Sequence, residues 1–82
     1  MNFKGVNETE FLLNRFVQKA WCSYSEQIAE NIWKEVSGRI PEPYKTKIAI
    51  EWGHVQMGHG RQQALSALKE EVDKFISEQL LK

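Results

Sequence analysis

Apolar residues recur at three- and four-residue spacing along two long stretches of this 82-residue chain. An α-helix turns about 100° per residue, so this spacing gathers the apolar side chains on one face of a helix. The first stretch contains Leu12, Leu13, Phe16, Val17, Ala20, Trp21 and Tyr24. The second contains Ala64, Leu65, Leu68, Val72, Phe75, Ile76 and Leu80. The periodicity therefore predicts an all-α, mainly helical chain.

The ends of the first helix are marked by capping signals. Asn7 followed by Glu10 matches a capping box and predicts the helix start. Gly38 and Pro41 end the pattern, because glycine accepts the left-handed C-terminal position and proline blocks continuation. A second capping box at 23–26 leaves a break near Ser23–Ser25 open. We favour one continuous helix over that break.

Residues 44–57 fit two structures. Alternation favours a strand and involves Ile48, Ile50 and Trp52. Four-residue spacing favours a helix and involves Tyr44, Ile48, Trp52 and Val55. A lone strand forms no sheet, so it would need residues 1–6 or a second copy of the chain as its partner. We favour the helix slightly, and predict a small bundle of two long antiparallel helices with 44–57 packed across them.

The chain is of single-domain size, and residues 1–82 are expected to form one small helical domain. Such a chain gains little net stability from its own core, which favours a homo-oligomer. Cys22 is the single cysteine, so an internal disulfide is excluded. We see neither a signal peptide nor an apolar run long enough to span a bilayer. These features predict a soluble cytoplasmic protein without membrane association.

Acidic and basic residues number eleven each, so the formal net charge is zero. Nucleic-acid binders normally carry a basic surplus, because phosphate neutralisation supplies much of their affinity. We therefore do not expect nucleic-acid binding, which is kept only as a further alternative that rests on Lys45, Lys47 and Arg61. Weak self-repulsion in a neutral chain also permits self-association.

The sequence offers little support for catalysis or metal binding. Gly53 and Gly58 have the glycine spacing of a phosphate-binding loop, but the lysine and hydroxyl that such a loop needs are missing. Glu51 and His54 have the spacing of a bundle metal motif, which occurs once here and lacks further ligands even when His59 is added. Cys22 is expected to be buried or half-buried and inert. We predict no enzymatic activity, no metal and no cofactor.

A glycine-rich segment precedes the last helix. Gly58, Gly60 and Arg61 stand where free backbone N–H groups and the helix dipole favour an anion, and Arg61 could add a bidentate contact. These three residues are our anion-binding candidates. They support an alternative function, in which an oligomer binds a small anionic ligand such as a nucleotide.

Aromatic residues give the strongest functional indication. The apolar arc of the first helix is too wide for one facing helix, and exposed aromatic side chains commonly anchor protein–protein contacts. Our interface candidates are Phe11, Trp21, Trp33, Tyr44 and Trp52. The leading hypothesis is a non-enzymatic interaction protein, an adaptor or inhibitor that binds a protein partner and forms a homo-oligomer. Its small size and lack of motifs would suit a phage accessory protein.

Overall fold

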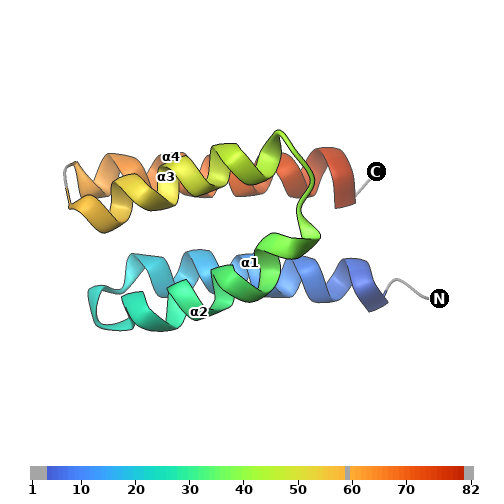
Figure 1. Ribbon diagram of the computed structural model, residues 1–82, viewed down its shortest axis with the longest axis horizontal. Coiled ribbons are helices and arrows are strands. Elements are labelled where there is room, and N and C mark those ends of the chain that lie inside the picture. Colours follow the sequence, from blue (N-terminus) through green and yellow to red (C-terminus); the bar gives the residue numbers. More distant parts are fainter. Residues whose placement is uncertain (1–3, 59, 81–82) are drawn as a thin grey trace.

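The computed structural model describes residues 4–58 and 60–80, and these form four α-helices without a strand (Figure 1). The helices are α1 (Lys4–Trp21), α2 (Glu26–Val36), α3 (Tyr44–Met57) and α4 (Arg61–Phe75). Short 3₁₀ turns are η1 (Ser23–Ser25) and η2 (Ser37–Arg39), and a π-helical turn, η3 (Ile76–Leu80), extends α4. The predicted all-α bundle is confirmed, and the helical alternative for 44–57 is the correct one.

The four helices form two antiparallel hairpins, α1 with α2 and α3 with α4 (Figure 1). The chain runs up and down through the bundle, so α1 and α4 also lie antiparallel beside each other. The two hairpin turns are at one end, and the connection between the hairpins is at the other. The bundle measures 41 × 22 × 17 Å. Its long faces are therefore formed by pairs of neighbouring helices.

Three details of the predicted layout are wrong. The first helix is not continuous: α1 ends at Trp21, and Cys22 has extended backbone with φ −100° and ψ 114°. The break lets α2 fold back on α1, which buries the apolar faces of both helices against each other. Asn7 lies inside α1, which begins at Lys4. Finally, α3 runs alongside α4 and does not cross the other helices (Figure 1).

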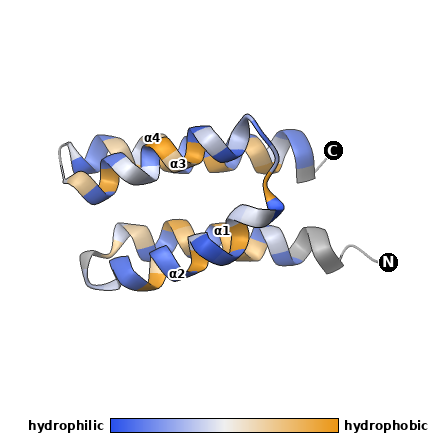
Figure 2. Cartoon of the chain, in the orientation of Figure 1, coloured by the Kyte–Doolittle hydropathy of each residue, from blue (hydrophilic) through white to orange (hydrophobic). Residues whose placement is uncertain are grey.

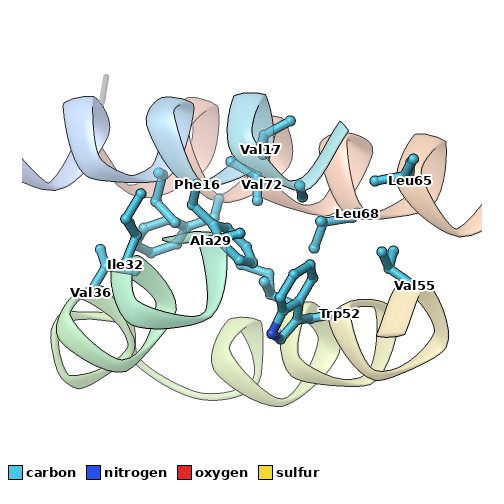
Figure 3. Close-up of a cluster of buried hydrophobic side chains, with 14 of the residues drawn as sticks. Phe16, Val17, Ala29, Ile32, Val36, Trp52, Val55, Leu65, Leu68 and Val72 are labelled. Atoms are coloured by element: carbon cyan, nitrogen blue, oxygen red, sulfur yellow. The ribbon is translucent and has the colours of Figure 1, made fainter. Parts of the chain in front are cut away.

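The core is a continuous cluster of apolar side chains contributed by every helix (Figure 3). Its largest fully buried members are Phe16, Phe75, Leu13, Ile48, Leu68, Val36, Val55 and Val72. Apolar residues recur between polar ones along the four helices, as the hydropathy colours in Figure 2 show. The wide apolar arc of α1 is explained by two neighbours, because α1 packs against both α2 and α4.

Polar contacts also connect the two hairpins. The Trp52 indole N–H donates to the Glu30 carboxylate at 2.7 Å, and the Gln56 amide donates to the same oxygen at 3.2 Å. The Arg61 guanidinium donates to the carbonyl oxygen of Ala20 at 2.9 Å. The bonds from Trp52 and Gln56 join α3 to α2, and the bond from Arg61 joins α4 to α1. Each therefore fixes one hairpin against the other.

Candidate interaction surface

The five aromatic interface candidates have different environments. Trp52 is only 3% exposed and belongs to the core, where its ring lies edge-on to Phe16 (Figure 3). Trp33 is half-buried and stacks on Phe16 with ring centroids 5.4 Å apart. Phe11 and Trp21 are 61% and 41% exposed. Burial thus removes Trp52 from the accessible surface, and Phe11 and Trp21 are the exposed members of the five candidates.

Tyr44, the remaining candidate, is half-buried near the end of the bundle that carries the hairpin connection. Its hydroxyl donates to the Glu78 carboxylate at 2.6 Å and accepts from the Gln79 amide at 3.3 Å. Donation to Glu78 raises the pKa of the Tyr44 phenol, because the hydrogen bond favours the protonated form. The two hydrogen bonds of Tyr44 therefore connect α3 to the C-terminal turn η3.

Phe11 and Trp21 lie on the same side of the bundle, over the junction of α1 and α4. Two adjoining hollows of about 420 and 540 Å³ occur there, and Trp21, Lys69 and Asp73 line both. From α1 the surface includes Phe11, Asn14, Arg15, Gln18 and Trp21. From α4 it includes Gln62, Ser66, Lys69, Glu70 and Asp73. We call these ten residues the α1/α4 face.

The charged groups of the α1/α4 face are balanced. Arg15 and Lys69 are basic, and Glu70 and Asp73 are acidic. Lys69 pairs with Asp73 at 2.8 Å, with both side chains more than half exposed. An exposed pair of this kind adds little stability. The face therefore combines two large aromatic groups with polar side chains that carry no net formal charge.

The structure gives the anion-binding candidates internal partners. The Arg61 guanidinium contacts the Ala20 and Val55 carbonyl oxygens at 2.9 and 3.4 Å and lies 3.7 Å from the Glu26 carboxylate. Gly58 has φ +82°, and its N–H donates to Val55. Gly60 has φ +56° and precedes α4. The guanidinium and the Gly58 N–H thus already have hydrogen-bond partners within the protein, which weakens the case for an anion ligand.

Cys22 is exposed, so the expectation of a buried or half-buried thiol is wrong. The cause is the helix break, which moves Cys22 from the interior of a helix to the turn after α1. A hydrogen bond with the Ser25 hydroxyl, aided by the Tyr24 backbone, lowers the pKa of the thiol. This arrangement favours the thiolate, which is the reactive form of cysteine.

The metal and catalytic motifs do not assemble into a centre. Among residues 4–58 and 60–80, no group of three or more His, Cys, Asp or Glu side chains is placed to hold a metal ion. The Glu51 and His54 side chains approach to 3.4 Å, and the His54 ring is more than half exposed. A shallow hollow of about 270 Å³ lies beside them. His59 lies outside the described residues.

Several surface groups were missed by sequence reasoning. Tyr24, at 96%, is the most exposed large apolar group in the described part of the chain; others are Ile28, Ile50 and Met57. Lys69 and Asp73 were also missed, because exposed charged residues on a helix have no distinctive sequence pattern, and only the packing of α1 beside α4 makes them part of this surface.

Over the described ranges, no helix has the combination of length and apolarity that spanning a bilayer requires. Comparisons of the chain with family models, curated proteins and solved structures find no match.

Proposed function

We propose that this protein is a non-enzymatic interaction protein that binds another protein through its α1/α4 face. The observation that carries the proposal is the pair of exposed aromatic side chains, Phe11 and Trp21, on one open hollowed surface. An adaptor or an inhibitor would work in this way, by occupying a surface of its target. The proposal needs no bound cofactor.

Energetic arguments favour Phe11 and Trp21 as anchors. Binding energy at interfaces concentrates in a few residues, and tryptophan is among the most frequent of them. The core already contains Phe16, Trp52 and Phe75, so Phe11 and Trp21 leave large areas in water that packing inside the monomer does not cover. Covering them is favourable by roughly 25 cal/mol for each Å² of apolar surface.

The surroundings of the two anchors favour a protein partner over a nucleic acid. Two basic and two acidic side chains lie on the α1/α4 face, so phosphate groups gain no net attraction there. Asn14 and Gln18 lie between Phe11 and Trp21 along α1, so neutral polar groups separate the two aromatic anchors. Protein–protein interfaces combine such aromatic anchors with polar groups and water-mediated contacts.

Site-specific photo-crosslinking in the cells that naturally produce the protein tests the proposal. Phe11 is replaced by p-benzoylphenylalanine, which keeps an aromatic ring at the position. Irradiation should yield a covalent adduct with a different protein, identified by mass spectrometry. A second sample combines the probe at position 11 with Trp21→Ala. That substitution should reduce the adduct at least tenfold, because it removes the other anchor.

The matched control places the same probe at Ile50, which is 51% exposed on α3. The proposal expects no comparable adduct from this position. Equal labelling from positions 11 and 50 would mean unspecific contact and contradict the proposal. The same conclusion follows if the probe at position 11 yields no adduct with a different protein.

A further inference from the structure

We infer that the α1/α4 face also pairs with the same face of a second copy of the chain, forming a two-fold symmetric dimer in which the α1 helices run antiparallel. The inference rests on the proposed function, because it names one occupant of the surface assigned there. A partner that uses the same face would have to displace the second copy. The dimer would therefore keep the two aromatic anchors covered until the partner competes.

The first argument is the spacing of the exposed residues on α1. Four of the five residues that α1 contributes to the face, Phe11, Asn14, Gln18 and Trp21, follow each other by three, four and three positions; the fifth, Arg15, lies outside this pattern. These four residues cover an arc of about 80° on the helix. This spacing is identical when read in either direction, with its centre at Phe16. An antiparallel copy therefore places Phe11 opposite the partner subunit's Trp21, and Asn14 opposite the partner subunit's Gln18.

These pairings are chemically matched. Phe11 and Trp21 would cover each other's exposed rings at both ends of the contact, and aromatic pairs of this kind contribute beyond the area they bury. Asn14 and Gln18 carry amides that both donate and accept hydrogen bonds, so they satisfy each other at the centre. In a two-fold interface each contact occurs twice.

The second argument comes from α4. Four of the five residues that α4 contributes to the α1/α4 face, Gln62, Ser66, Lys69 and Asp73, are spaced by four, three and four positions, which is again symmetric; Glu70, the fifth, lies outside this pattern. Since α4 runs antiparallel beside α1, one two-fold axis across both helices can relate both stripes. An axis along the helices would instead lay Phe11 and Trp21 over the polar stripe of α4, which is less favourable.

The charges of the face permit the contact. The two basic and two acidic side chains cancel, so two copies of the α1/α4 face do not repel through net charge. The face covers about 15–17 Å along each of the two helices, so the contact is smaller than a standard interface and the dimer is expected to be weak and reversible. A chain of this size also gains stability from burying a face.

Sedimentation equilibrium over a wide concentration range tests the dimer. The wild-type chain should show a reversible monomer–dimer equilibrium. Trp21→Ala should raise the dimer dissociation constant at least tenfold, because the substitution removes two contacts per dimer. Ile50→Ser, on α3, should change it less than twofold. Circular dichroism of each variant checks that the fold is retained, which the exposure of both side chains favours.

Disulfide trapping tests the antiparallel register. Asn14→Cys and Gln18→Cys are made separately in a Cys22→Ser background, which removes the native thiol. A mixture of the two variants under mild oxidation should form the mixed disulfide several-fold faster than either variant forms a disulfide with itself. Equal rates, or faster self-pairing, would overturn the register. The same two variants with Trp21→Ala should lose the mixed product.

The outcomes separate this inference from the proposed function. A wild-type chain that stays monomeric at several hundred micromolar overturns the dimer, as does equal weakening by Trp21→Ala and Ile50→Ser. If the probe at position 11 still captures a different protein from a monomeric chain, the proposed function stands without the dimer. A dimer of the stated register with no captured protein supports the dimer and contradicts the proposed partner.

Discussion

The guanidinium of Arg61 donates a 2.9 Å hydrogen bond to the main-chain carbonyl of Ala20, 41 positions earlier in the chain. Arg61 is the first residue of α4, and Ala20 lies in the last turn of α1. Carbonyl groups in a last helical turn lack helical partners, and a positive charge beside them is favourable. The Arg61 side chain thus caps the C-terminal end of α1 and connects the second hairpin to the first.

Replacing Arg61 with alanine is expected to lower the free energy of unfolding by about 1.5–3 kcal/mol, since hydrogen bonds to charged groups contribute about that much. The melting temperature should fall by roughly 4–8 °C for each kcal/mol. The control is Arg39→Ala, which breaks an exposed 3.1 Å ion pair with Glu8 and should cost under about 0.5 kcal/mol. Equal losses in the two variants would show that Arg61 does not link the hairpins.

Two glycine substitutions should act in opposite directions. Gly58 ends α3 with φ +82°, so Gly58→Ala should destabilise the protein by about 1–2 kcal/mol through left-handed backbone strain. Gly53 lies inside α3, where an added Cβ meets nothing within 4 Å. Gly53→Ala should therefore stabilise by about 0.5–1 kcal/mol. Urea unfolding measures the free energy of unfolding of both variants. A change of the same sign in both variants would refute this account of the turn.

Stability at high pH should depend on Tyr44. Its hydrogen bond to Glu78 raises the pKa of the phenol in the folded state above the usual value near 10. The folded state thus holds this proton more tightly than the unfolded state, and the contribution is present below about pH 10. It declines as pH rises from 10 through the raised folded pKa. The free energy of unfolding, measured from pH 8 to 11, should fall more steeply for wild type than for Tyr44→Phe; parallel curves would disprove the contribution.

The Cys22 thiol should react with Ellman's reagent in the native protein, because it is exposed and its pKa is lowered by Ser25. Ser25→Ala should slow the reaction at neutral pH by roughly twofold, since the thiolate fraction falls more than its nucleophilicity rises. The rate in denaturant provides the reference. A native thiol that reacts only after unfolding would contradict the observed position of Cys22.

The sequence alone determined the helical character of this chain and most of its core. The three- and four-residue spacing identified Leu13, Phe16, Leu68 and Val72 as core residues, and each is fully buried. It also indicated where the helices around Gly38 and Gly58 would end. Periodicity succeeds in these cases because the side of a helix on which a residue lies follows from its position along the same helix.

Only the tertiary structure decided the break after Trp21, the burial of Trp52 and the pairing of α1 with α4. The capping signals around Ser23 were compatible with a continuous helix, and the gain from folding α2 back on α1 depends on residues far along the chain. The α1/α4 face likewise combines Phe11 and Trp21 with Lys69 and Asp73, which no local pattern connects. A helix pattern reports which residues face inward, whereas the choice of neighbour depends on packing among all the helices at once.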